Sequence, residues 1–100
     1  MSAEAVVWSL YVLRCADRSL YTGITTDVAR RLREHRDSTR GARYLRGRAP
    51  LTLVFEVQVG DRSAASRAEN RVKSLSKNEK ESLLASPDRL RRRVLEFAEA

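Results

Sequence analysis

The alternation of apolar and polar residues between Leu51 and Val59 constrains the fold of this chain more than any other feature. Every second position of this segment is apolar, and three of the four positions between them are polar. A period of two places successive side chains on opposite faces of an extended strand, which a helix with 3.6 residues per turn does not do. The segment therefore predicts a β-strand with one fully buried face.

Two more extended segments stand near the start of the chain. Val6 to Arg14 is rich in β-branched and aromatic residues and is too short and uncapped for a helix. After turn residues at positions 16–19, Leu20-Tyr21-Thr22 resumes the extended pattern until Gly23 interrupts it. The two segments predict an antiparallel hairpin.

Helical patterns fill most of the remaining chain. A first helix is predicted from about Asp27 to Asp37, with Thr26 as its N-cap. A second follows Gly60, with Asp61 as its cap. Its apolar stripe at steps of three and four comprises Ala65, Ala68, Val72 and Leu75.

Two shorter helices complete the prediction. Ser76 and Glu79 have the spacing of a capping box, and Ser86-Pro87 starts the last helix, with an apolar face of Leu90, Val94, Phe97 and Ala98. We predict one domain over residues 1–100, with a core at about 6–84 and a covering helix at about 87–99. The fold class is α/β of the α+β type, in the order strand, strand, helix, strand, helix, helix, helix.

The charge of the chain indicates its partner. Seventeen Arg and three Lys stand against 13 acids, which gives a net charge of +7. Such an excess attracts polyanions, and the guanidinium fork grips phosphate through two parallel hydrogen bonds, so nucleic acid is the expected partner. A lone Cys15 favours a reducing compartment and predicts a cytoplasmic location. No segment predicts a membrane span or a signal peptide.

Three charged residues on predicted helices are candidates for chemistry. Arg31 and His35 are four positions apart, so both side chains project from one helix face and can converge on one phosphate. The alternative is a solvated basic helix face. Glu69 stands four residues before Lys73, a spacing that commonly gives a surface ion pair worth a few tenths of a kcal/mol.

A basic connector precedes the third predicted strand. We expect it to bind nucleic acid beside the site, with phosphate contacts from arginines and stacking of an unpaired base on a tyrosine. A solvated basic loop is the alternative. The residues concerned are Arg40, Arg43, Tyr44, Arg46 and Arg48. The lysines Lys73, Lys77 and Lys80 are interpreted instead as helix-surface charge.

A tyrosine in a strand is by itself an ordinary packing residue. The two strand tyrosines become candidate site residues only when they are considered together with Arg31, His35 and Glu69. Ser9-Leu10-Tyr11 and Tyr21-Thr22-Gly23 resemble the two halves of the GIY-YIG nuclease signature, with the tyrosines ten positions apart. Arg31 and His35 match the Arg and His of the helix that follows in that family. Glu69 matches its metal-binding acid.

The resemblance extends over roughly residues 8–75 and has specific departures. Ser9 and Leu10 replace Gly and Ile of the first half, and Thr22 replaces the Ile of the second. Two further segments resemble the small stand-alone bacterial members. They are Leu20-Tyr21-Thr22-Gly23-Ile24-Thr25 and Gly41-Ala42-Arg43-Tyr44 leading to Leu53-Val54-Phe55.

This resemblance implies a GIY-YIG-like three-stranded antiparallel sheet flanked by helices, and a metal-dependent endonuclease. It implies catalytic roles for Tyr11, Tyr21, Arg31, His35 and Glu69, with Tyr11 as general base. Glu69 would hold one divalent ion, with Mg²⁺ expected and Mn²⁺ as the alternative. Tyr21 would orient the phosphate or the water, and His35 would relay a proton or bind phosphate.

The expected substrate is DNA, with RNA as an open alternative. We expect selectivity for branches, flaps or damage rather than for sequence, in a repair or recombination setting. A protein partner that supplies specificity is compatible with so small a chain, and the expected state is a monomer or weak homodimer. Two other interpretations stay open: a catalytically silent nucleic-acid-binding or partner-docking module, and a small basic ribosome-associated protein.

Overall fold

The computed structural model describes residues 6–37 and 41–99. Its strands are β1 (Trp8–Arg14), β2 (Leu20–Thr25) and β3 (Thr52–Gly60). Its helices are α1 (Val28–Asp37), the 3₁₀ turn η1 (Arg43–Leu45), α2 (Arg62–Lys73), α3 (Lys77–Leu84) and α4 (Pro87–Glu99). The helices and strands follow one another in the predicted order, and η1 is an additional short turn in the basic connector. No described helix has the length and apolar character that crossing a bilayer requires.

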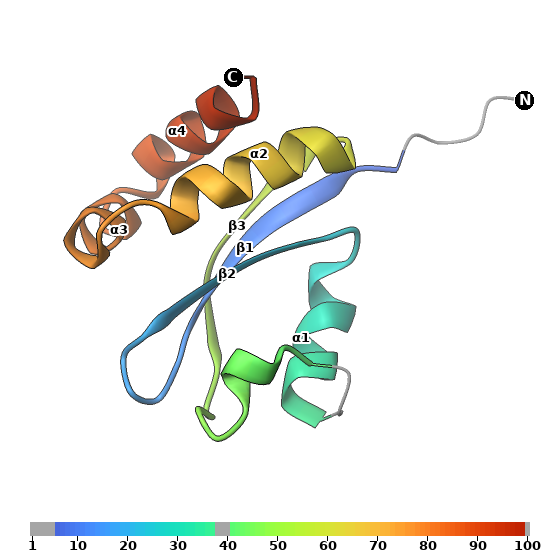
Figure 1. The fold of residues 1–100 in the computed structure, drawn as a ribbon, viewed down its shortest axis with the longest axis vertical. Coiled ribbons are helices and arrows are strands. Elements are labelled where there is room, and N and C mark those ends of the chain that lie inside the picture. The colour runs from blue at the N-terminus through green and yellow to red at the C-terminus, as the bar shows by residue number, and fades with distance from the viewer. Residues whose placement is uncertain (1–5, 38–40, 100) are drawn as a thin grey trace, which may run out of the picture.

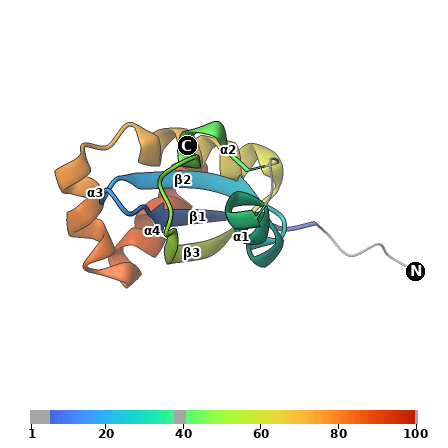
Figure 2. The ribbon, with the colours of Figure 1, turned by 90° about the horizontal axis from the view of Figure 1, so that it is seen from below.

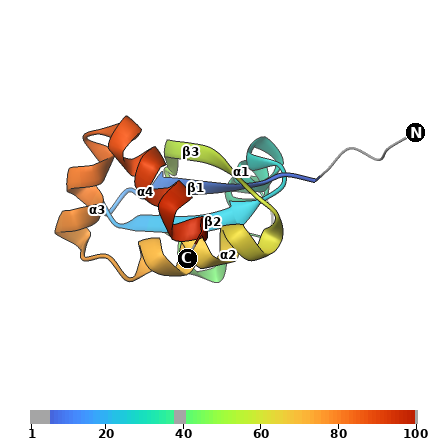
Figure 3. The ribbon, with the colours of Figure 1, turned by 90° about the horizontal axis from the view of Figure 1, so that it is seen from above.

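The sheet is antiparallel, and β1 is its central strand. The order is β2-β1-β3, so both neighbours of β1 are edge strands. Figure 1 shows α2 and α4 on one side of this sheet and α1 on the other. Views from below and above show α2 running beside β2 (Figures 2 and 3). We call the two sides the α2/α4 face and the α1 face.

Each face of the sheet has its own apolar cluster. On the α2/α4 face, Leu10 and Val12 of β1 lie against Ala68 and Val72 of α2 and Val94 of α4. Alanine at the α2 contact lets the helix approach the strands closely. The α1 face holds a second cluster, which comprises Tyr11, Leu13, Cys15, Leu45 and Leu51. Alternate residues of β1 therefore serve opposite layers.

β3 differs from the predicted strand with one buried face. The pairing of β1 with β3 shifts register between Val12 and Leu13, which leaves an extra residue in β3. Phe55 and Val57 consequently join the α2/α4 cluster, whereas Leu53 packs on the α1 face. The period of two predicted the strand correctly and its single apolar face wrongly, because a bulge changes which face the following residues meet.

Gly23 also differs from its predicted role, since it lies inside β2 and does not end the strand. It is paired with Tyr11 in β1. A Cβ atom at residue 23 would lie 2.5 Å from the Tyr11 hydroxyl and 2.6 Å from Cζ. The glycine therefore leaves room for the Tyr11 ring to lie across β2.

Two of the predicted helix caps are present in the structure, and one is replaced by its neighbour. Asp61 accepts a hydrogen bond from the Ala64 N–H, and Ser76 forms the expected capping box with Glu79. In α1 the cap is Asp27 and not Thr26, because Asp27 Oδ1 accepts from the Arg30 N–H at 3.0 Å. Carboxylates and hydroxyls are both good caps, so composition alone does not separate adjacent candidates.

A bidentate ion pair connects β1 to α3. Arg14 donates to both carboxylate oxygens of Glu81 at 2.7 Å, and this hydrogen bonding lowers the pKa of Glu81 to about 2. Both side chains are about one-third exposed, so we expect Glu81→Gln to lower the free energy of unfolding by only about 0.5–1 kcal/mol. Urea denaturation measures this loss.

The pH dependence of that loss identifies its origin. Below the ordinary pKa of 4.5 the unfolded chain takes up a proton that the native Glu81 refuses, so the stabilisation should disappear as the pH falls from about 4.5 to about 2. Glu96→Gln removes one charge from an exposed position of α4 and serves as control. Equal losses in the two variants would assign the effect to net charge.

Candidate active site

Three ring side chains from separate elements meet on the α1 face. Tyr11 comes from β1, Tyr21 from β2 and His35 from the last turn of α1. The ring centroids of Tyr11 and Tyr21 are 6.3 Å apart, and that of His35 lies 6.0 Å from Tyr11 and 5.5 Å from Tyr21. The cross-strand arrangement of the hairpin and the position of α1 over this face bring together residues that span 24 positions of the chain.

The Tyr11 hydroxyl is the centre of this cluster. Its oxygen lies 2.7 Å from Nε2 of His35, and the Arg31 guanidinium is close enough to lower the pKa of this hydroxyl. Tyr11 is 2% exposed and His35 is 9% exposed. The interpretation of His35 as part of a solvated helix face is therefore wrong, because its ring is enclosed.

The backbone next to His35 decides which of its nitrogens carries hydrogen. The Ala42 N–H donates to His35 Nδ1 at 3.1 Å, so Nδ1 is an acceptor and holds no proton. A neutral imidazole must then carry its hydrogen on Nε2, and it donates that hydrogen to the Tyr11 oxygen. His35 is thereby a donor at one nitrogen and already engaged as an acceptor at the other.

Burial and nearby charges shift the pKa values of Tyr11 and His35 in directions that fit this hydrogen bonding. Burial raises the pKa of Tyr11 above its ordinary value, with Tyr21 and Glu69 acting in the same direction and Arg31 in the opposite one. Burial lowers the pKa of His35, and the positive charge of Arg31 adds to this lowering. At neutral pH the free protein therefore holds a neutral phenol beside a neutral imidazole.

The hydrogen bond from Ala42 to His35 depends on Gly41. A Cβ atom on residue 41 would lie 2.7 Å from the His35 Cα and 2.9 Å from the Glu34 carbonyl oxygen. Gly41→Ala must therefore move this backbone away from α1. We expect loss of the Ala42 donor, a mixture of both neutral tautomers, and a His35 pKa closer to its ordinary value. The chain has one histidine, so long-range proton–nitrogen NMR spectra report these changes without overlap.

The lowered pKa of His35 also predicts how the free energy of unfolding depends on pH. The native His35 has a pKa below its ordinary value of 6.5, so the unfolded chain binds a proton more readily below about pH 6.5. The free energy of unfolding should therefore decrease as the pH falls below that value. A native His35 that titrates at or above 6.5, or that carries hydrogen on Nδ1 at neutral pH, would contradict the arrangement.

Arg31 is held at the edge of the cluster by its own helix. Its Nη1 donates to Glu34 Oε1 at 2.9 Å, three residues along α1. The side chain is 29% exposed, in contrast to the enclosed His35 four residues later. The Arg31 side chain is therefore partly open to solvent while its charge acts on the buried Tyr11 hydroxyl, and a phosphate can approach it from the solvent side.

Glu69 reaches this neighbourhood from α2. Its side chain is 19% exposed, and its Oε2 lies 3.2 Å from the Lys73 ammonium, so the ion pair considered from the sequence is present. After burial and Tyr21, Glu69 is among the groups that raise the pKa of Tyr11, which places its charge within electrostatic range of that hydroxyl.

The oxygen atoms near Tyr11 fit some metal ions and not others. Within residues 6–37 and 41–99, no group of at least three His, Cys, Asp and Glu side chains is placed to hold an ion. Structural zinc needs four such ligands and does not fit. One carboxylate, Glu69, within electrostatic range of the Tyr11 hydroxyl, fits Mg²⁺ or Mn²⁺, which keep several waters and complete their coordination on substrate phosphates.

η1 places part of the basic connector against this cluster. The Tyr44 ring stacks near Tyr21, with centroids 6.0 Å apart and planes at 27°. Arg48 lies over the Tyr44 ring at 4.2 Å from its centroid, donates to the Tyr44 carbonyl oxygen at 2.7 Å and pairs with Asp17. Stacking of a base on this face of Tyr44 therefore requires Arg48 to move.

The other connector arginines are less constrained. Arg43 and Arg46 are exposed, as both a nucleic-acid contact and a solvated loop require. Arg40 lies outside the described residues. Contact of these three arginines with nucleic acid stays a prediction.

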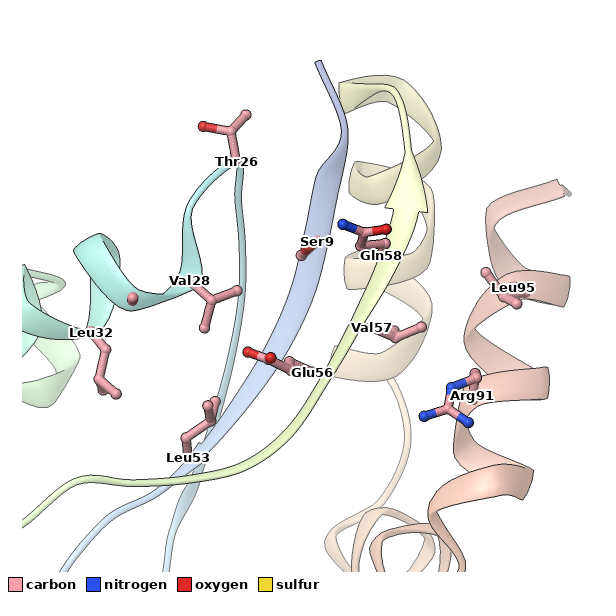
Figure 4. Close-up of a pocket in the computed structure, with 11 residues that line it drawn as sticks. Ser9, Thr26, Val28, Leu32, Leu53, Glu56, Val57, Gln58, Arg91 and Leu95 are labelled. Atoms are coloured by element: carbon pink, nitrogen blue, oxygen red, sulfur yellow. The ribbon is translucent and has the colours of Figure 1, made fainter. Parts of the chain in front are cut away.

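A wide hollow of about 880 Å³ lies elsewhere, at the edge of β3 (Figure 4). Val28 and Leu32 of α1 form one wall, and Glu56 projects from β3 toward them. Glu56 is paired with Tyr11 across the strands, but the Tyr11 ring runs the other way, across β2. None of the five candidate catalytic residues lines this hollow, so its size does not locate the chemistry.

Sequence reasoning missed three residues beside the cluster. Gly41 gave no signal beyond its place in a family-like segment, because a close backbone approach leaves no periodicity. Lys73 and Lys80 were interpreted as surface charge, yet both line a groove with Tyr21 and Tyr44. The spacing of Glu69 and Lys73 was the available signal for the first lysine.

Comparison with known proteins agrees with this geometry. Residues 7–82 match the family described as the GIY-YIG catalytic domain. The chain is 60% identical over 78 residues to the UPF0213 protein YhbQ of Escherichia coli (strain K12), which covers 78% of this chain and 77% of that protein. The protein of the same name from Salmonella arizonae is 56% identical over 81 residues, covering 81% and 80%.

A solved structure agrees as well. The solution NMR structure of the UPF0213 protein BH0048 from Bacillus halodurans has 40% sequence identity and a TM-score of 0.53, covering 84% of this chain and 92% of that one. The tyrosine motifs and α+β order that pointed to the family from sequence thus agree with a matched family, close relatives and a solved fold. This chain belongs to the GIY-YIG nuclease family.

Proposed function

We propose that this protein is a metal-dependent endonuclease that hydrolyses phosphodiester bonds in DNA. The observation that carries the proposal is the convergence on one hydroxyl: the Tyr11 oxygen lies 2.7 Å from His35 Nε2, and the charges of Arg31 and Glu69 both act on its pKa. GIY-YIG nucleases generally use divalent metals, and the oxygen donors here fit such an ion. The net charge of +7 suits a polyanionic substrate.

Hydrolysis of a phosphodiester needs three things from a site. Water must lose a proton as its oxygen bonds to phosphorus, negative charge on the phosphoryl oxygens must be balanced, and the leaving sugar oxygen must gain a proton as its bond to phosphorus breaks. In this proposal Arg31 binds a non-bridging phosphoryl oxygen. A divalent ion held at Glu69 would supply further positive charge and acidify bound water.

Tyr11 is the proposed proton acceptor, and His35 is its hydrogen-bond donor. His35 donates to the Tyr11 oxygen and Arg31 places positive charge near it, and both interactions strengthen when that oxygen becomes negative. His35 is a poor base in this geometry, because Nε2 already carries hydrogen and Nδ1 accepts from Ala42. Since burial keeps Tyr11 protonated in the free protein, the phenolate requires the additional positive charge of the loaded site.

Tyr21 completes the proposed site as an orienting residue. Its ring meets the His35 ring edge-on, which restricts the imidazole to one orientation. Its place on edge strand β2 puts the phenol beside the groove that contains Lys73. We assign it the orientation of the phosphate or the attacking water.

Cleavage of labelled DNA tests the proposal. Single-stranded, duplex, flap and branched substrates are incubated with Mg²⁺, Mn²⁺ or a chelator, beside identically purified Tyr11→Phe and Glu69→Ala proteins. We expect metal-dependent cutting by wild type that both variants lose, with a preference among structures rather than sequences. Cutting that the variants retain would reveal a contaminant, and salt-sensitive binding without cutting would favour the docking module.

A further inference from the structure

A groove of about 320 Å³ adjoins the proposed site on the β2 side of the sheet. Its walls come from four elements: β2, η1, α2 and α3. The lining residues are Leu20, Tyr21, Thr22, Tyr44, Lys73 and Lys80. Among these described residues none is acidic, and two carry ammonium groups.

The groove is continuous with the site through two side chains. Tyr21 belongs to both, since its ring touches the His35 cluster and lines the groove. Lys73 also belongs to both, because its ammonium lies 3.2 Å from Glu69 Oε2 and the residue lines the groove. A ligand that extends from the site along β2 would therefore pass these lysines.

We propose that this groove binds the DNA phosphate next to the scissile one, through Lys73 and Lys80. The inference rests on the proposed nuclease function. Each DNA strand carries a charge about every 3.4 Å of helix axis, so a phosphate at Arg31 brings its neighbours close to any adjacent basic groove. Lysine is a compact point charge that holds phosphate without demanding one geometry, which suits contact with a backbone of any sequence.

Lys73 has a second role in this proposal, as an exchangeable counter-charge. In the free protein it neutralises Glu69, and half of its side chain remains exposed. A cation bound at Glu69 would compete with Lys73 for the carboxylate and repel its ammonium, which would then pair with a phosphate in the groove. Lys80 makes no ion pair with any described carboxylate, so its charge is available to the groove throughout.

The salt dependence of DNA binding in a chelator tests the groove without any cleavage. Binding of a fluorescent strand and of its duplex is measured at several salt concentrations for wild type, Lys73→Gln, Lys80→Gln, Arg43→Gln and the control Arg91→Gln. Arg91 lies at the β3 edge, across the sheet from the groove, and its loss changes net charge equally. Lys80→Gln should flatten the slope of log K against log salt by about 0.9 on duplex or about 0.7 on single strand. Lys73→Gln should flatten it less, because without a cation the Lys73 ammonium stays paired with Glu69.

If the lysine variants gave the same slope as Arg91→Gln, the proposed phosphate contact in the groove would be wrong, because the lysines would then act only through net charge. A flattened slope in Arg43→Gln with none in the lysine variants would also overturn it and move the contact to η1. The proposed function fails separately: lysine slopes as expected, without metal-dependent cutting of any substrate, would leave a binding groove on a protein that is not a nuclease.

Mn²⁺ binding separates the two lysines. We expect Lys73→Gln to raise the Mn²⁺ affinity of the DNA-free protein by about 2-fold, because it removes an ion pair within one helix that competes for Glu69, and Lys80→Gln to leave the affinity unchanged. Paramagnetic broadening of amide signals around residue 69 measures this affinity. Equal Mn²⁺ affinities for wild type and Lys73→Gln would overturn the counter-charge role.

Discussion

Glu69→Gln is expected to reduce metal-dependent DNA cleavage by roughly 10²- to 10³-fold, the loss of several kcal/mol of charge stabilisation at about 1.4 kcal/mol per tenfold. The amide keeps the size of the side chain and loses the charge that holds a cation. Glu69 makes an ion pair with Lys73 within one helix, which contributes only a few tenths of a kcal/mol to the fold. Single-turnover cleavage rates at several Mg²⁺ concentrations measure the effect.

DNA binding in a chelator is the control for this variant. Removing an acid from the edge of a phosphate-binding surface should leave that binding equal or slightly stronger. Urea denaturation should show nearly unchanged stability. A Glu69→Gln protein that cuts at the wild-type rate, with the wild-type Mg²⁺ dependence, would remove Glu69 from the mechanism. Weaker binding in the chelator would instead show that the substitution disturbed the surface.

Tyr11→Phe is expected to lower the cleavage rate by about 10²- to 10⁴-fold, the usual contribution of a positioned general base. The ring still fills its space over Gly23, so β1 and β2 keep their pairing. The buried Nε2–H of His35 loses its acceptor, which should cost about 1–3 kcal/mol of stability. Cleavage and unfolding must therefore be measured on the same preparation.

Val94→Ala provides the matched control for that loss of stability. Val94 is fully buried between α4 and the α2/α4 face, on the other side of the sheet from Tyr11. Its truncation should lower stability without touching the site, and cleavage below the unfolding temperature should persist. If Val94→Ala lost as much activity as Tyr11→Phe, reduced stability would explain both results, and Tyr11 would lose its proposed role.

Local chemistry in the sequence determined most of the fold. The alternating β3 segment, the turn between β1 and β2 and the caps at Asp61 and Ser76 each depend on neighbours within a few residues. Such signals can be read without knowing what packs against them. The tyrosine spacing and the order of Arg31, His35 and Glu69 pointed in the same way to a family, which relatives confirm. Their catalytic roles stay predictions.

Tertiary contacts decided what each of these groups can do. No local sequence pattern predicts that residue 23 must lack a side chain to leave room for Tyr11. Nor does one predict that Gly41 lets the Ala42 N–H reach His35 and select its tautomer. The bulge that divides β3 between two faces also depends on register with β1. Distances, burial and hydrogen-bond direction arise only when distant segments meet, and these quantities set whether a histidine donates, a tyrosine stays protonated or a lysine serves a carboxylate.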